Sequence, residues 1–189
     1  MDTQTEVLCD TILHISEVRQ ALEIFESLLR QRGLAHDRTK LEAFEFDAFV
    51  KTRPEFKKAN YGTPEYEACT EAIKPAIDHH YANNRHHTAH RRFVCNGCFT
   101  EYDTEPDRCD RCGYSQFQEE TGIEAMTLVD LLEMLADWAA ASRRSPDVEL
   151  EDTLDDAFAR YGINPQLARI IRNTIRELRR LGGIPEKRP

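Results

Sequence analysis

Long apolar runs are missing from this sequence, and no segment approaches the roughly 20 apolar residues that cross a bilayer, so no membrane partner is expected. The opening residues, MDTQTEVLCD, lack the basic and apolar segments of a secretory signal, which predicts a cytoplasmic protein. Basic residues are also in deficit, with 25 lysines and arginines against 34 acidic residues and a formal net charge of -9. This deficit argues against indiscriminate binding to nucleic acid, although a metal centre could still attract a phosphate substrate.

The periodicity of apolar residues predicts an all-α chain outside the cysteine-rich segment. Gly33 is expected to end the first helix, Pro75 to kink or break the third, and Thr127 to cap the fourth. The expected helices cover about residues 5–32, 38–51, 63 to at least 77, 126–142, 149–161 and 164–181.

Four of the six cysteines form two CxxC pairs, Cys95-x2-Cys98 and Cys109-x2-Cys112, with ten residues between the pairs. Each pair can bind one ion through two thiolates, and two pairs complete the closed tetrahedron of a structural zinc site. Disulfides are disfavoured in a cytoplasmic protein, and a redox pair is disfavoured because no βαβ pattern surrounds the motif. Iron in a rubredoxin-like site stays open, since sulfur ligands alone do not separate the two metals. The two other cysteines, Cys9 and Cys69, stand alone on expected helices and are interpreted as small core residues.

Histidines and acidic residues form a second group with the chemistry of metal ligands. His36 and Asp37 are adjacent, and Lys40 follows one helical turn after the histidine. The stretch HHYANNRHH holds four of the seven histidines in two pairs at seven-residue spacing: His79, His80, His86 and His87. If one helix continued through this stretch, each pair would lie on one face, two turns apart. Either phase of that helix serves, so the inward-facing histidine of each pair is left open.

Imidazole and carboxylate ligands together suit Mn, Fe, Co, Ni or Zn. A lysine one turn after the His-Asp doublet could neutralise a phosphate oxygen. His14, on the first helix, is by itself more typical of a satisfied or exposed side chain than of a ligand. Asp137 shares one narrow polar stripe with Asp130 and Glu133. That stripe is either a solvated acidic face or the lining of a polar cavity between helices.

Together these residues resemble the HD-domain superfamily of metal-dependent phosphohydrolases, whose pattern is an early His, a His-Asp doublet, further histidines in some members and a late Asp, all on helices. A closer resemblance is to a family of uncharacterised bacterial and phage proteins with HD-like signatures. It spans most of residues 12–92 and 122–178, and the stretches that carry it are HISEV, RGLAHDRTKL, YGTPEYEACTEAIKPAIDHHYANNRHH, GIEAMTLVDLLEMLADWAAAS and RYGINPQLARIIRNTI. Where that family tends to read HHPEH, this chain reads HHTAH, which puts the role of the acidic position in doubt.

The resemblance implies an HD-domain-like helical bundle, residues 1–92 and 122–189, with a small inserted zinc ribbon at residues 93–121. It implies one or two divalent transition-metal ions, in addition to the structural zinc that the cysteine spacing predicts. It gives catalytic roles to Lys40 and to whichever of His86 and His87 is not a ligand. The implied substrate is a small phosphorylated molecule, and a nucleotide is favoured. The implied metal ligands are His14, His36, Asp37, His79 or His80, His86 or His87, and Asp137, which favours a site-lining role for this last aspartate.

Two other functions stay open at this point. In the first, the protein is a binding module: the helical domain has the HD-like fold but catalyses no reaction. The ribbon then recognises a protein or, less favoured, a nucleic acid. This function is supported by a basic stripe on the last helix, made of Arg169, Arg172, Arg176 and Arg179 or Arg180. The other interpretation, which is favoured, is a solvated face whose charge balances the acidic stretch 147–156. In the second, the histidine cluster is a pH-sensitive switch for assembly.

Overall fold

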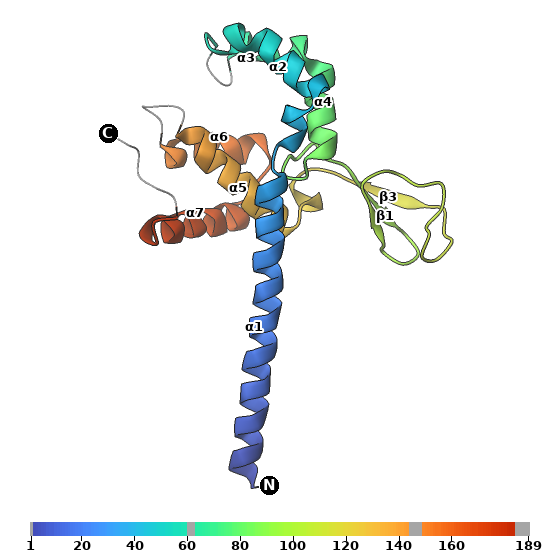
Figure 1. Cartoon of the computed structure of the whole chain (residues 1–189), viewed down its shortest axis with the longest axis vertical. Coiled ribbons are helices and arrows are strands. Elements are labelled where there is room, and N and C mark those ends of the chain that lie inside the picture. Colours follow the sequence, from blue (N-terminus) through green and yellow to red (C-terminus); the bar gives the residue numbers. More distant parts are fainter. Residues whose placement is uncertain (1, 60–62, 144–148, 184–189) are drawn as a thin grey trace. The chain divides into compact units, whose positions relative to one another are not determined.

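The protein is described by a computed structural model over residues 2–59, 63–143 and 149–183 (Figure 1). The chain divides into two compact units, Met1–His36 and Asp37–Pro189. Helices dominate both units, and in the described part of the chain strands occur only between Arg92 and Glu120. This confirms the predicted helical chain interrupted by a small module, while the bounds of the three predicted segments stay predictions.

The first unit is essentially one helix, α1 (Thr3–Ala35), of 33 residues. Asp2 caps it by accepting a hydrogen bond from the Thr5 amide at 2.8 Å. The predicted end at Gly33 is wrong, because this glycine stays within the helix and the first positive φ after it belongs to Asp37. Among the described residues, no helix combines the length and the apolar character needed to cross a membrane.

The second unit opens with a short 3-10 helix, η1 (Arg38–Leu41), followed by α2 (Ala43–Phe56). The predicted single helix over 38–51 is therefore divided, because Glu42 between the two has an extended backbone with ψ of 143°. The next two helices are α3 (Pro64–Ala72) and α4 (Lys74–Asn83). The break expected from Pro75 is confirmed, and this proline lies in the first turn of α4, where no intrahelical N–H is needed.

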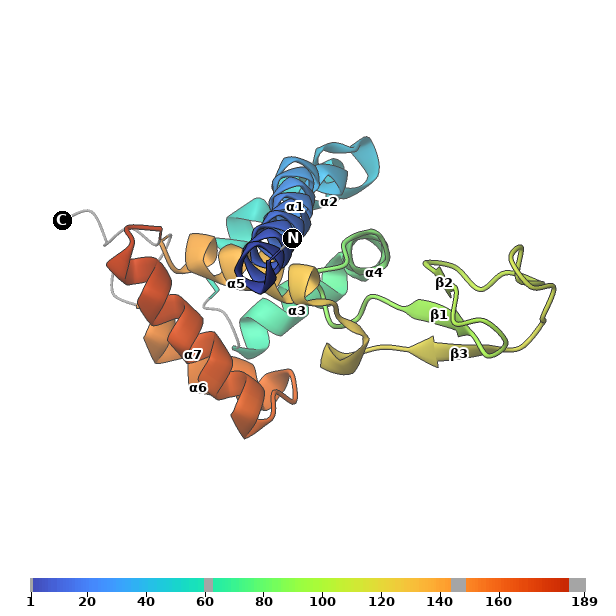
Figure 2. The same cartoon turned by 90° about the horizontal axis from the view of Figure 1, so that it is seen from below.

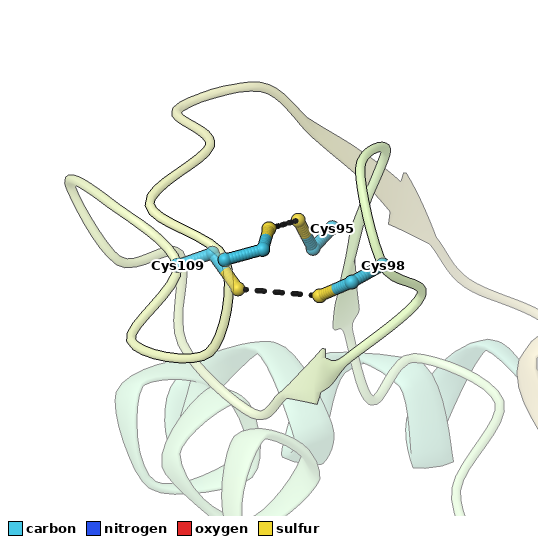
Figure 3. A group of neighbouring side chains, drawn as sticks. Cys95, Cys98 and Cys109 are labelled. Atoms are coloured by element: carbon cyan, nitrogen blue, oxygen red, sulfur yellow. Dashed lines mark hydrogen bonds between the residues drawn. The ribbon is translucent and has the colours of Figure 1, made fainter.

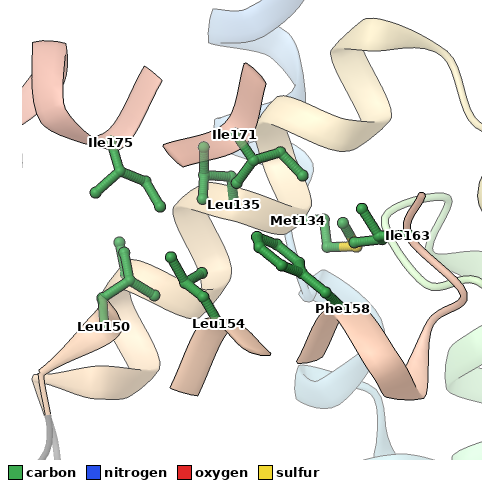
Figure 4. Close-up of a cluster of buried hydrophobic side chains, with 9 residues drawn as sticks. Met134, Leu135, Leu150, Leu154, Phe158, Ile163, Ile171 and Ile175 are labelled. Carbon is green, nitrogen blue, oxygen red and sulfur yellow. The ribbon is translucent and has the colours of Figure 1, made fainter. Parts of the chain in front are cut away.

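The apolar core of the second unit joins three helices, α5 (Leu128–Ser142), α6 (Leu150–Arg160) and α7 (Pro165–Arg180), which follow a short 3-10 helix, η2 (Ile123–Ala125). The predicted cap is confirmed, since Thr127 Oγ1 accepts from the Asp130 amide at 3.1 Å. This packing fixes the rotation of α5 about its axis, and with it the direction of the acidic stripe. Eight of the core side chains are labelled in Figure 4: Met134, Leu135, Leu150, Leu154, Phe158, Ile163, Ile171 and Ile175.

The cysteine-rich segment forms a three-stranded antiparallel sheet in the order β2-β1-β3 (Figure 2). Its strands are short: β1 (Arg92–Cys95), β2 (Glu101–Tyr102) and β3 (Phe117–Glu120). Arg92 on the central strand pairs with Glu101 on one neighbour at 3.0 Å and with Glu120 on the other at 2.6 Å. One guanidinium group therefore ties together all three strands of a sheet that is too small to bury a core of its own.

Candidate metal centre

Asp37 occupies a left-handed turn directly after α1. Its φ of 56° lies in a region that aspartate tolerates better than most residues. The turn is closed by the Lys40 amide, which donates to the Asp37 carbonyl oxygen at 3.0 Å. The side chains also pair, with Lys40 Nζ 2.6 Å from Oδ2 of Asp37. The carboxylate is thus held on one side by its own turn.

Two histidines approach the other oxygen of this carboxylate, and a third lies beside them. His80 Nε2 lies 3.2 Å from Oδ1 of Asp37, and His86 Nε2 lies 3.5 Å from the same oxygen. His87 joins them, with its Nε2 at 2.9 Å from Nε2 of His80. The helix α4 ends at Asn83, so His86 and His87 come back to His80 through a change of chain direction and not along one helical face. The four side chains each offer one ligand atom within 4.8 Å of all the others.

These separations suit ligands that share one ion. Two nitrogen or oxygen atoms, each about 2.0 to 2.1 Å from an ion, lie roughly 2.9 Å apart at a right angle and about 3.4 Å apart in a tetrahedron. The two distances from His80 Nε2, 2.9 Å to His87 and 3.2 Å to Asp37, fall in this range. Three imidazoles with one carboxylate are also the donor set that divalent transition metals prefer.

Glu45 is completely buried on α2, behind two of the histidines, with 0% of its surface exposed. Its Oε2 lies 3.0 Å from His80 Nδ1, and its Oε1 lies 2.7 Å from His79 Nδ1. Thr39 Oγ1 donates to Oε2 at 3.0 Å, so both carboxylate oxygens are engaged. A proton on His80 Nδ1, donated to this carboxylate, leaves the Nε2 lone pair directed at Asp37. Carboxylates orient metal-binding histidines in this way and raise their basicity.

The sequence analysis did not identify Glu45, although the sequence carries a signal for it. Glu45 precedes Phe49 by four residues, which places the carboxylate on the same helical face as an aromatic ring. A charged residue on the inner face of a helix is uncommon unless it is paired. Its partners come from α4 and η1, and a pattern within α2 does not reveal them.

The acidic stripe of α5 faces inward. Asp130 and Glu133 are buried, with 2% and 9% of their surfaces exposed, and Asp137 is half-buried. Oε1 of Glu133 lies 3.1 Å from Nδ1 of His86, so a second buried carboxylate lies beside a histidine of the group. A carboxylate oxygen of Asp137 lies within 4.8 Å of one of Asp37. The interpretation as a solvated acidic face is therefore wrong, and the stripe lines the polar site.

Besides Asp137, three of the predicted ligands lie outside this group of four. His79 contacts Glu45 and meets the edge of the Phe44 ring, with centroids 5.4 Å apart. His36 is the C-cap residue of α1, immediately before Asp37. His14 is exposed on α1, and no ligand group found among the described residues includes it. Their roles as ligands stay predictions.

His87 is a neutral imidazole at neutral pH. Burial lowers its pKa to about 3, and the neighbouring His86, His80 and Lys40 act in the same direction. Metal ions bind the neutral form of histidine, so protons do not compete for this nitrogen at neutral pH. The ring also packs against Tyr81, with centroids 4.6 Å apart, which holds its orientation.

The four ribbon cysteines form a second ligand group, with one sulfur from each within 4.8 Å of the others. Figure 3 shows Cys95, Cys98 and Cys109 with their sulfur atoms turned toward one another. The Sγ atoms of Cys95 and Cys112, and those of Cys98 and Cys109, are 3.5 Å apart, and all four are free thiols. Sulfurs bound tetrahedrally to one zinc at about 2.3 Å lie roughly 3.8 Å apart. The group can therefore bind one ion, as the sequence predicts.

Hydrogen bonds to two of the four sulfurs, those of Cys98 and Cys109, favour the thiolate form. Tyr102 donates its hydroxyl to Cys109 Sγ at 3.2 Å and lowers the pKa of that thiol to about 6. A hydrogen bond with Thr100 likewise lowers the pKa of the Cys98 thiol. Thiolates are the form in which cysteine binds metals, so these contacts favour an occupied site.

Glu45→Gln is expected to weaken metal binding at the histidine group by about 10- to 100-fold. A neutral amide accepts a weaker hydrogen bond, and its NH2 group opposes the proton on a histidine Nδ1. Calorimetric titration of the metal-free chain with Zn²⁺ or Mn²⁺ measures the change. The control is Glu55→Gln, at an exposed position of the same helix. Equal affinities for both variants would show that Glu45 does not orient the ligands.

One comparison with known proteins bears on this chain. The model of the Family of unknown function (DUF5662) matches residues 3–177, so the chain belongs to that family. No curated protein and no solved structure matches the chain. Membership in this family carries no activity with it, and the function has to be inferred from the geometry of the site.

Proposed function

We propose that this member of the DUF5662 family is a metal-dependent phosphohydrolase of the HD-domain type, acting on a nucleotide or another phosphate ester. The observation that carries the proposal is the convergence of Asp37, His80, His86 and His87, with one ligand atom each within 4.8 Å of the others. Buried carboxylates stand behind two of the three rings. A divalent transition metal held there would polarise a phosphoryl oxygen and would lower the pKa of a bound water.

The residues of the chain have separate tasks in this proposal. Asp37, His80 and one or both of His86 and His87 would bind the ion, and Glu45 and Glu133 would orient His80 and His86. Lys40 neutralises the charge that develops on the phosphate, because its ammonium group already lies beside the metal-binding carboxylate at 2.6 Å. Whichever of His86 and His87 is not needed as a ligand moves a proton to or from the reacting oxygen.

A second ion is part of the same proposal. Asp37 would hold this ion as well as the first, with its Oδ2 now paired with Lys40 Nζ at 2.6 Å. Asp137 supports this, because its carboxylate lies within 4.8 Å of Asp37.

Element-resolved metal analysis together with a hydrolysis screen tests the proposal. The chain, purified with Mn²⁺ or Fe²⁺, is expected to hold one ion in the ribbon and at least one more. It is expected to release phosphate from nucleotides, or to cleave cyclic nucleotides or generic phosphodiesters. A chain that binds the ribbon ion alone would overturn the proposal and leave the alternatives of a binding module or a pH switch.

The basic stripe on α7 gives the binding module little support. Arg179 pairs with Glu149 at 2.9 Å and with Glu151 at 2.5 Å. Arg172 pairs with Asp155 at 2.5 Å and stacks on the Phe158 ring. These acidic partners lie on α6 or at its N-cap, so the two arginines join α7 to α6. They are not available to a nucleic acid in the way a free basic surface would be.

A further inference from the structure

An apolar stripe runs along α1, and no residue of this helix is buried. The stripe repeats every seven residues over four aliphatic side chains, with two further apolar residues three positions after the second and third: Leu8, Ile15, Leu22 and Leu29, with Val18 and Phe25. These six side chains are between 38% and 60% exposed. Exposed apolar surface of this length on a folded protein marks an interaction site.

The spacing identifies the kind of partner. A strict seven-residue repeat with a second apolar position three residues on is the pattern of a helix that winds around another helix. Thr11 occupies the same second position in the preceding repeat, and no charged residue falls on the stripe between Leu8 and Leu29. The charges lie beside the stripe and pair within α1, Arg19 with Glu23 at 3.0 Å and Arg30 with Glu26 at 3.1 Å.

The length of the stripe selects the partner. From Leu8 to Leu29 it extends about 32 Å at 1.5 Å per residue. The next longest described helix, α7, has 16 residues, which corresponds to about 24 Å. Within the described ranges, only α1 itself, with 33 residues, is long enough to cover the whole stripe as a single helix, so the partner is the α1 of a second copy. Because the stripe carries no charged residue, two copies of it can pack together without electrostatic repulsion.

We propose that α1 is a dimerisation element, which pairs along this stripe with α1 of a second copy of the chain. The pairing buries the six stripe residues of each copy and leaves the Arg19 and Arg30 ion pairs in solvent. It requires nothing of the metal centre, so it holds or fails independently of the proposed activity.

Sedimentation analysis of the full chain tests the pairing. The wild type is expected at twice the chain mass of 21.9 kDa. Leu22→Glu places a charge in the seam and is expected to raise the dissociation constant of the dimer at least about 100-fold. Leu13→Glu is the matched control, since Leu13 is 61% exposed on the same helix but lies off the stripe, and it is expected to stay dimeric.

A cross-linking experiment keeps the proposal testable if Leu22→Glu fails to fold. In a background with Cys9→Ser, Val18→Cys is expected to give a covalent dimer in at least about tenfold higher yield than Leu13→Cys, because only the seam position brings two sulfurs within bonding reach. A monomeric wild type, or equal behaviour of the seam and control variants in both experiments, would overturn the proposal. A monomer that unfolds at lower temperature with Leu22→Glu would assign the stripe to packing within one chain.

Discussion

If the chain is the metal-dependent hydrolase proposed above, Asp37→Asn is expected to remove the metal from the histidine group, to leave the ribbon ion in place, and to lower the proposed phosphohydrolase activity by at least about 100-fold. Loss of a residue that orients a ligand typically costs 10- to 100-fold, and the loss of an anionic ligand itself exceeds that. Asparagine keeps the shape of the side chain and tolerates a φ of 56°, so the turn after α1 should survive. The effect therefore reports on the charge of the carboxylate and not on the fold.

Asp78→Asn is the matched control for this substitution. Asp78 lies on α4, close in sequence to the ligand His80, and pairs with Lys74 at 2.7 Å in an exposed i, i+4 contact. Such exposed pairs contribute little, so metal content and activity should stay near the wild-type values. Metal analysis gives ions per chain for both variants, and kcat/KM gives the activity. An Asp37→Asn protein that keeps both ions would remove Asp37 from the site.

The sequence indicates that this site has the residue types of a metal centre, but it does not indicate which of the histidines come together. The His-Asp doublet and the paired histidines point to metal binding through residue chemistry alone. Which histidines converge depends on the end of α4 at Asn83, after which the chain turns and brings His86 and His87 to His80. That end is set by contacts between elements, such as Asn84 Nδ2 donating to Thr39 Oγ1 at 2.9 Å, which a periodicity cannot show.

The acidic stripe of α5 is a second case in which the periodicity of the sequence does not determine the structure. Asp130, Glu133 and Asp137 repeat at a spacing that describes a solvated face as well as a buried one. The core formed with α6 and α7 decides between them, because it fixes how α5 is rotated. The opposite error occurs on α1, where Cys9 was expected in a core but is exposed. A helical pattern predicts which residues share a face, and only the partner determines whether that face is covered.

Cys109→Ser is expected to release the ribbon metal and unfold the segment from Arg92 to Glu120. The segment has only short strands, the shortest of two residues, and cannot bury enough apolar surface to fold by itself. Structural zinc contributes about 10 to 16 kcal/mol to the folding of comparable modules, so losing one of four ligands should be decisive. Cys109 is the most informative position, because its thiolate also accepts the hydrogen bond from Tyr102 at 3.2 Å.

Metal analysis and hydrogen exchange of the same protein separate the ribbon from the histidine group. Amides of β1 and β3 should exchange freely in Cys109→Ser, whereas the helix α5 and the ion bound by the histidines should be unaffected. Cys69→Ser on α3 is the control, since Cys69 lies outside the ligand group and should leave both ions in place. Loss of both ions in Cys109→Ser would mean that the ribbon supports the histidine group. Two links could transmit the effect: β1 closely follows His90 in the chain, and the Gly122 amide donates to the Thr88 carbonyl at 2.8 Å. Retention of the ribbon ion would instead remove Cys109 from the set of ligands.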